Sequence, residues 1–145
     1  MVKKLEDKDR TKITVKTIVN KPVEKVWECF TLSEHITRWS YASEDWFSPV
    51  AENDLRVGGK FLTRMEAKDG SYGFDFCGIY EKIQENELIY YTLGDGREVK
   101  INFISGGSET KIIETFDAEE ENSIELQEQG WQQILNNFKK YTEGQ

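Results

Sequence analysis

The end of the chain constrains its fold most. Residues 122–141 have the spacing of an amphipathic helix, in which large side chains recur every three or four residues along one stripe. The stripe consists of Leu126, Gly130, Trp131, Ile134, Leu135 and Phe138. Such a helix needs a large apolar surface to pack on, and the segments before it have the pattern of short strands separated by tight turns. The simplest arrangement is one long terminal helix lying across a curved antiparallel sheet.

Alternation and turn residues predict the strands of that sheet. Residues 11–20 alternate apolar and polar side chains, which is typical of a strand with one solvent-exposed face. Dipeptides found in tight hairpins, such as Asp69-Gly70 and Asp95-Gly96, separate the later segments. Counting residues 11–20 first, we predict seven strands, the others at residues 53–57, 60–67, 74–84, 88–93, 98–104 and 111–116.

Two short helices are predicted between the first and second strands. Pro22 opens a segment with helical spacing, and proline is tolerated there because amides in the first turn of a helix have no partners within it. Thr31 and Glu34 have the spacing of a capping box, which predicts a second helix from about residue 32 to residue 39. The order of elements indicates an α+β domain.

The segment between these helices and the next strand is predicted to be irregular. Residues 40–51 carry Trp46 and Phe47 among polar side chains, and a loop this aromatic usually covers something. A lid over a pocket, a dimer contact and a local mini-core are the three explanations that stay open.

Gly130 is the unusual residue of the terminal helix. A glycine inside a helix costs about 1 kcal/mol relative to alanine, so its presence needs a reason. One explanation is that backbone or a bound molecule approaches more closely here than a side chain allows. The other is tight packing of helix on sheet without any ligand.

Length and charge limit the class of protein. A chain of 145 residues has the size of one domain, which we assign to residues 11–145, after a flexible basic N-terminus at residues 1–10. The net charge of -8 argues against a nucleic-acid partner, because binding to phosphates depends on clustered Lys and Arg. No apolar run is long enough for a membrane span. Cys29 and Cys77 have no paired spacing and are expected to be small buried residues, so we expect a cytoplasmic location.

Several stretches resemble a known family. They are residues 22–27 (PVEKVW), 34–39, 55–61 (LRVGGKF), 78–83 (GIYEKI), 115–116 and 130–131. Together they are similar to the bacterial relatives of the C-terminal domain of the activator of heat-shock protein 90 ATPase, within the START-like (SRPBCC) superfamily. The resemblance spans about residues 11–141. It implies the helix-grip fold, also called Bet v 1-like, in which a seven-stranded antiparallel sheet bends around the terminal helix and leaves a cavity for apolar molecules.

The residues themselves favour an aromatic lining for such a cavity. Phe61 and Met65 share the apolar phase of their strand, whereas the inward phase of residues 88–93 cannot be assigned from the pattern. Solid packing is the alternative to a ligand-sized cavity. The predicted ligand-binding residues are His35, Trp39, Trp46, Phe61, Met65, Phe76, Tyr80, Tyr90, Trp131 and Leu135.

No convincing catalytic set is visible. His35 is the single histidine, so it cannot form a two-histidine metal site, and as a pocket base it would have to face inward beside Trp39. There is no phosphate-binding or dinucleotide-binding motif, and we predict no cofactor, no metal and no catalytic residue. The polar side chains that can point into a pocket and orient a ligand are Arg64, Asp75, Tyr90 and Glu114.

Three functions are compatible with this sequence. The first is a protein that binds a small hydrophobic or aromatic ligand between the sheet and the terminal helix. The second is a cyclase-like or hydrolase-like enzyme that uses the same cavity. The third is a chaperone-interaction module like the relatives named above, with a chaperone or a second copy of the chain as partner. The first is preferred because aromatic residues are plentiful and a catalytic set is missing.

Overall fold

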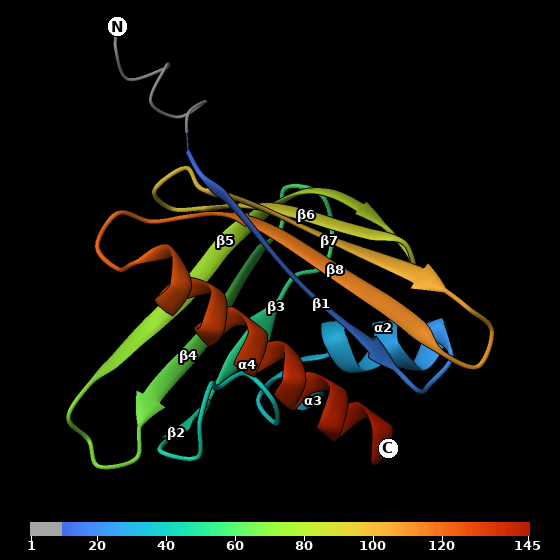
Figure 1. Ribbon diagram of the computed structural model, residues 1–145, viewed down its shortest axis with the longest axis horizontal. Helices are drawn as coiled ribbons and strands as arrows, with labels where there is room; N and C mark the ends of the chain where they lie inside the picture. The colour runs from blue at the N-terminus through green and yellow to red at the C-terminus, as the bar shows by residue number, and fades with distance from the viewer. Residues whose placement is uncertain (1–9) are drawn as a thin grey trace, which may run out of the picture.

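The computed structural model describes residues 10–145, so the predicted flexible segment 1–10 lies outside the described residues except for Arg10. Figure 1 shows a curved sheet with the last helix lying across its concave side. The elements in chain order are β1 (Lys12–Val19), α2 (Val23–Thr31), α3 (Ser33–Ile36), β2 (Trp46–Phe47), β3 (Ala51–Asn53), β4 (Lys60–Ala67), β5 (Gly73–Gln84), β6 (Leu88–Leu93), β7 (Glu98–Ser105), β8 (Thr110–Asp117) and α4 (Ile124–Glu143).

The strands form one antiparallel sheet of eight strands, one more than predicted. Its order is β1-β8-β7-β6-β5-β4-β2, and β3 also pairs with β4. The additional strand is β2, which lies in the segment predicted to be irregular and pairs Trp46 with Ala67. The antiparallel sheet around a terminal helix is confirmed, because consecutive strands from β4 to β8 are hairpin neighbours as the turn residues indicate.

The strand predicted at residues 53–57 is displaced. Pairing with β4 ends at Asn53, and the following residues turn. Gly58 has a φ of 84°, which favours glycine, and a Cβ at Gly59 would lie 2.1 Å from the carbonyl oxygen of Asp54. The Gly58-Gly59 pair therefore closes a tight loop instead of ending a strand.

The helices differ from prediction mainly at the capping box. Thr31 is the last residue of α2, and its hydroxyl donates to the carbonyl oxygen of Trp27 at 2.7 Å, so it does not cap α3. The helix α3 ends at Ile36, earlier than predicted. The helix α4 begins after Ser123, whose hydroxyl oxygen accepts a hydrogen bond from the amide of Leu126 at 3.1 Å. The order of one strand, two short helices, the other strands and a long helix is as predicted.

Aromatic rings fill the space beneath the second half of α4. Phe138 is fully buried, and its ring centroid lies 5.0 Å from that of Phe30 and 4.9 Å from that of Trp39. Trp27 meets Phe103 of β7 edge to face at 5.1 Å. Figure 1 places α2 and α3 near this end of α4. Here α4 packs on α2 and Trp39, and its contacts with β1 join it to the sheet.

The two cysteines have different surroundings. Cys29 is fully buried in α2, as expected, and burial raises the pKa of its thiol. Cys77 is exposed, so the expectation that it is buried is wrong. The side chain of Cys77 points to the outer face of β5, because its neighbour Phe76 occupies the inward phase of that strand.

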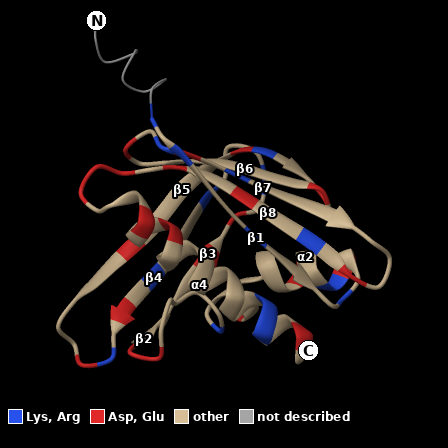
Figure 2. Cartoon of the chain, viewed as in Figure 1, with Lys and Arg blue, Asp and Glu red and all other residues tan. Residues whose placement is uncertain are grey.

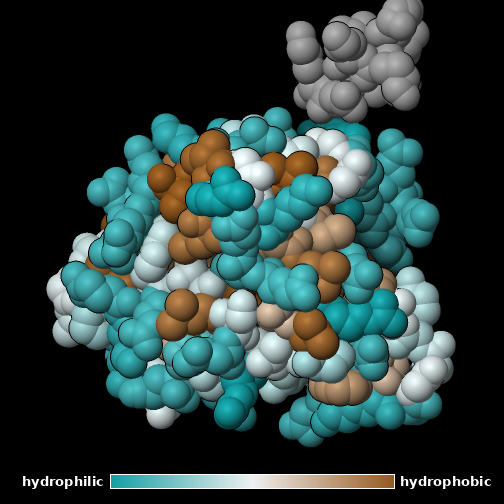
Figure 3. All heavy atoms as spheres, turned by 180° about the vertical axis from the view of Figure 1, so that it is seen from behind, coloured by the Kyte–Doolittle hydropathy of each residue, from teal (hydrophilic) through white to brown (hydrophobic). Residues whose placement is uncertain are grey.

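Charges and apolar side chains are unevenly distributed on the surface. Figure 2 shows acidic residues along the β8–α4 loop and at the start of α4, where the helix dipole favours their negative charge. From behind, exposed apolar side chains are divided by polar ones (Figure 3). Within residues 10–145, no helix combines the length and apolar character that a membrane crossing needs.

Candidate functional site

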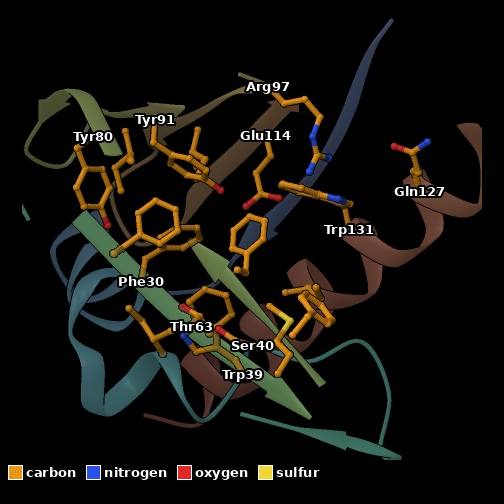
Figure 4. A pocket seen from close by; sticks show the side chains of 18 of the residues that line it. Phe30, Trp39, Ser40, Thr63, Tyr80, Tyr91, Arg97, Glu114, Gln127 and Trp131 are labelled. Atoms are coloured by element: carbon orange, nitrogen blue, oxygen red, sulfur yellow. The ribbon is translucent and has the colours of Figure 1, made fainter. Parts of the chain in front are cut away.

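A cavity of about 350 Å³ lies between the sheet and the first half of α4. Trp131 and Ile134 of α4 line one side, and inward side chains of the strands line the other. Figure 4 shows these side chains converging on the cavity from several elements. The helix and sheet are therefore separated at this end, whereas α4 packs on α2 and Trp39 at the other.

Ring contacts hold the walls of the cavity in place. The ring of Phe61 lies 4.7 Å from that of Tyr91 and 5.3 Å from that of Tyr80, measured between centroids. Trp131 stacks on Phe116 at 3.8 Å with 12° between the ring planes. Such contacts restrict side-chain motion, so the cavity is preformed rather than created by collapse around a ligand.

Six of the ten predicted binding residues line the cavity. Phe61 and Met65 share the inward phase of β4, as their alternation indicates, and Phe76 and Tyr80 do so on β5. Their role in binding a ligand stays a prediction. The six are Trp39, Phe61, Met65, Phe76, Tyr80 and Trp131.

Tyr90 and Leu135 lie outside the cavity. On β6 the buried phase is Ile89, Tyr91 and Leu93, so Tyr90 points to the outer face, where the Lys100 ammonium lies 5.1 Å from the centre of its ring. Leu135 is 1% exposed and belongs to the packed core, and its neighbour Ile134 faces the cavity instead. Tyr91 is thus the β6 tyrosine that lines the cavity.

Trp46 also lies outside the cavity. Its ring packs on Tyr72 at 6.0 Å and on Phe74 at 5.9 Å, near the β4–β5 hairpin. Pairing of β2 with β4 fixes it there. Tyr72 is 63% exposed and Phe74 is 38% exposed, so this ring cluster lies at the surface, and the three explanations for the aromatic loop stay predictions. Phe74 also lines the cavity.

His35 connects helices and does not reach the cavity. Its Nδ1 lies 2.6 Å from the hydroxyl oxygen of Tyr141 in α4, and its Nε2 lies 3.5 Å from a carboxylate oxygen of Glu28 in α2. The histidine thus links α3 to both neighbouring helices. Within the described part of the chain, no three His, Cys, Asp or Glu side chains are grouped so that they could hold a metal ion.

No other described part of the protein lies close to Gly130. A Cβ built on it meets no protein atom within 4 Å outside its own helix turn, so neither a close backbone nor tight packing on the sheet explains the glycine, and the approach of a bound molecule stays a prediction. The residue borders a separate open groove between α4 and residues 41–44. At Gly78 of β5, in contrast, a Cβ would lie 2.7 Å from the carbonyl oxygen of Thr92.

Glu114 is the most unusual polar group of the cavity. Only 7% of it is exposed, and it lies on β8 in the apolar phase that also includes Ile112 and Phe116. Its neighbours across the sheet are Val15 of β1 and Ile101 of β7. Burial raises the pKa of the Glu114 carboxyl to about 8, because no nearby group compensates the lost hydration of the charged form.

The sequence contained a signal for Glu114. It is a single carboxyl residue on the apolar face of an alternating strand, and it was one of four polar candidates. Of the others, Arg64 and Asp75 form an ion pair at 3.2 Å and Tyr90 lies on the outer face, so Glu114 alone of the four reaches the cavity.

Hydrogen bonds and an ion pair involve the polar residues that line the cavity near the start of α4. The amide oxygen of Gln127 accepts from the backbone amide of Glu119 at 2.9 Å, and its amide nitrogen donates to the Glu119 carbonyl at 3.0 Å. Arg97 lies 2.8 Å from a carboxylate oxygen of Asp95. The Gln127 bonds fix the β8–α4 loop against the helix, and the Arg97–Asp95 pair lies within the β6–β7 hairpin.

The comparisons with known proteins agree with this architecture. A family model described as Activator of Hsp90 ATPase homolog 1-like protein matches residues 20–143. The chain belongs to this family. A comparison with curated proteins gives no match.

Solved structures of similar proteins extend the family over nearly the whole chain. The solution structure of the AHSA1-like protein from Aeromonas hydrophila is 40% identical, with a TM-score of 0.86, and covers 92% of this chain and 93% of that one. A protein from Cytophaga hutchinsonii is 53% identical, with a TM-score of 0.80 and 92% of each chain covered. A protein from Chromobacterium violaceum, 22% identical with a TM-score of 0.83, covers 92% of this chain and 98% of that one and shares the fold. The predicted START-like family is confirmed.

Proposed function

We propose that this family member binds a small apolar or aromatic molecule in the cavity between α4 and the sheet. The observation that carries the proposal is the cavity of about 350 Å³ with aromatic walls. This volume lies at the lower end of the range of small-molecule sites, roughly 300 to 1,000 Å³. Apolar walls favour ligands whose surface loses contact with water on binding.

A variant that fills the cavity tests this function. Thr63 lines the cavity from β4, so Thr63→Phe is expected to occupy the ligand's space. Leu62→Phe is the matched control, because Leu62 pairs with exposed Cys77 and does not line the cavity. Native mass spectrometry with a panel of hydrophobic compounds should show uptake by the wild type and by Leu62→Phe but not by Thr63→Phe. Equal uptake by all three would contradict the proposal.

A chaperone-interaction function is the second candidate, because the matching family is described by its likeness to an activator of Hsp90 ATPase. It predicts that the purified protein raises the ATPase rate of Hsp90 at micromolar concentration. Thr63→Phe should leave such an effect unchanged, because the substituted side chain is buried, with 7% of Thr63 exposed. The two functions are therefore separable with one variant.

A further inference from the structure

Tyr91 and Glu114 line the cavity, and their side-chain oxygens form no hydrogen bond within residues 10–145, as is also the case for the hydroxyls of Ser40 and Thr63. The neighbouring Tyr80 is different, because its hydroxyl donates to the side-chain oxygen of Asn53. Both Tyr91 and Glu114 are at most 7% exposed. Neither group is among the unpaired side-chain atoms that are fully closed off from solvent, so their oxygens face the cavity, where a ligand can reach them and form a hydrogen bond.

The fold brings these two groups together. Tyr91 of β6 and Glu114 of β8 flank β7, where their paired neighbours are Val99 and Ile101. Figure 4 shows the oxygen atoms of both side chains pointing into the same part of the cavity. The carboxyl also acts on Tyr91 electrostatically: burial raises the pKa of the Tyr91 phenol first, and the Glu114 charge raises it further. The two groups therefore lie within electrostatic reach of each other.

The surroundings of Glu114 favour its neutral form. The elements packed against it contribute apolar groups, Val15 from β1, Ile101 from β7 and Trp131 from α4. The titratable groups that line the same cavity are Tyr80, Tyr91, Arg97 and Glu119, and the Arg97 guanidinium is already paired with Asp95. With its pKa raised to about 8, the Glu114 carboxyl carries a proton at pH 7 and is a hydrogen-bond donor.

We infer that Tyr91 and Glu114 form a two-donor site for an uncharged oxygen acceptor, such as the carbonyl oxygen of a small aromatic ketone. A carbonyl oxygen has two lone pairs and can accept from both O–H groups, while the apolar remainder of the molecule contacts the aromatic walls. An ammonium ligand would instead require an ionised Glu114 among apolar neighbours. This inference rests on the proposed function and specifies the chemical class of its ligand.

Three matched probes test the inference on the full-length protein. Benzophenone has the carbonyl, diphenylmethane has the same two rings without it, and benzhydrylamine places an amine at that position. By isothermal titration at pH 6, benzophenone should bind roughly tenfold more tightly than diphenylmethane, which corresponds to the worth of one to two buried hydrogen bonds. Its affinity should fall from pH 6 to pH 9 as Glu114 loses its proton, while diphenylmethane binding stays constant.

Variants of Glu114 and Tyr91 test whether these two side chains cause the preference for benzophenone over diphenylmethane. Glu114→Gln keeps a donor, so it should retain the preference for benzophenone within about threefold and lose the pH dependence. Glu114→Met and Tyr91→Phe each remove a donor and should reduce the preference roughly fivefold, with diphenylmethane binding unchanged as proof of an intact cavity. Tyr90→Phe is the control on the outer face of the same strand and should bind like the wild type.

The outcomes separate this inference from the proposed function. Equal binding of ketone and hydrocarbon by the wild type overturns the two-donor site but leaves the binding function intact. Tightest binding of benzhydrylamine, with affinity rising with pH, overturns it in favour of a carboxylate site for cations. If native mass spectrometry shows no uptake of the ketone, the inference is overturned; if it also shows no uptake of any compound of the hydrophobic panel, the proposed function fails with it.

Discussion

Glu114 is a buried carboxyl that should reduce the stability of the fold, and the proposed site would give it a role. A carboxyl placed between Val15 and Ile101 loses hydration and gains no partner in return. A residue of similar size and no charge would serve packing better at this position of β8. The side chain is thus a cost to folding that a ligand with a suitable oxygen would offset.

The pH dependence of folding provides a direct test of this cost. The unfolded chain ionises Glu114 near its ordinary pKa of 4.5, whereas the folded protein keeps the proton up to a pKa of about 8. Between these values the folded state binds more protons, so the free energy of unfolding should fall as pH rises from 5 to 8, by a few kcal/mol, and level off above. Urea denaturation at several pH values should show a much flatter curve for Glu114→Gln. If the free energy of unfolding of the wild type and of Glu114→Gln changed equally with pH, the raised pKa of Glu114 would be contradicted.

His35 and Tyr141 give a second prediction for single residues. Tyr141→Phe removes the hydroxyl that lies 2.6 Å from His35 Nδ1 and should lower the free energy of unfolding by about 1 kcal/mol. Ligand uptake should stay normal, because neither residue lines the cavity. Tyr72→Phe is the control, since Tyr72 is 63% exposed and should change stability little. If Tyr141→Phe had the same free energy of unfolding as the wild type, the hydrogen bond between Tyr141 and His35 would contribute nothing to stability.

At the scale of elements, the two halves of α4 have different surroundings. Its second half is held by Phe138, which packs on Phe30 of α2 and on Trp39, while contacts with β1 join the helix to the sheet. Its first half, with Trp131 and Ile134, forms a wall of the cavity. A helix anchored at one end can cover a cavity at the other without losing its position.

The glycines of α4 and β5 should respond in opposite ways to alanine. Gly130→Ala should raise the free energy of unfolding by up to about 1 kcal/mol, because a Cβ meets nothing within 4 Å and alanine favours the helix. Gly78→Ala should lower it, because the new Cβ would lie 2.7 Å from the carbonyl oxygen of Thr92. Thermal denaturation of the two variants checks both signs. If Gly130→Ala instead lowers the free energy of unfolding, some group must lie closer to this residue than the structure indicates.

At the scale of the whole molecule, the cavity couples binding to folding. Space that is not filled by side chains forgoes packing contacts, and a ligand that occupies it binds only the folded state. A free ligand at 100 times its dissociation constant adds about 2.7 kcal/mol to the free energy of unfolding. If the protein binds a ligand as proposed, thermal unfolding should therefore report whether the cavity is occupied.

This coupling predicts a shift in melting temperature. Saturating the wild type with a compound that it takes up should raise Tm by several degrees, about 2 to 4 °C for each kcal/mol in a domain of this size. Thr63→Phe should show no shift with the same compound, and Leu62→Phe should shift like the wild type. A compound that raises Tm equally in all three variants binds elsewhere on the surface.

Much of this architecture was predictable, because it depends on local patterns. The hairpin dipeptides, the alternation of β1 and β4 and the helical stripe of α4 are short-range signals, and they gave the order of elements and the inward phase of Phe61 and Met65. The phase of β6 was not predictable. Ile89, Tyr91 and Leu93 alternate with residues of similar hydrophobicity, so the choice between Tyr90 and Tyr91 depended on which face the sheet buries.

The sequence by itself indicated the family through the resemblance of several short stretches. It also predicted the antiparallel sheet with its terminal helix and an aromatic interior, because residue spacing and turn dipeptides specify these within a few residues. Only the tertiary structure decided that α4 is packed solidly at one end and stands over a cavity at the other. It also decided that Glu114 lies inside with Tyr91, while His35, Trp46, Tyr90 and Leu135 do not line the cavity. The reason is physical: a cavity is the space left between elements far apart in the chain, and no local pattern of residues encodes it.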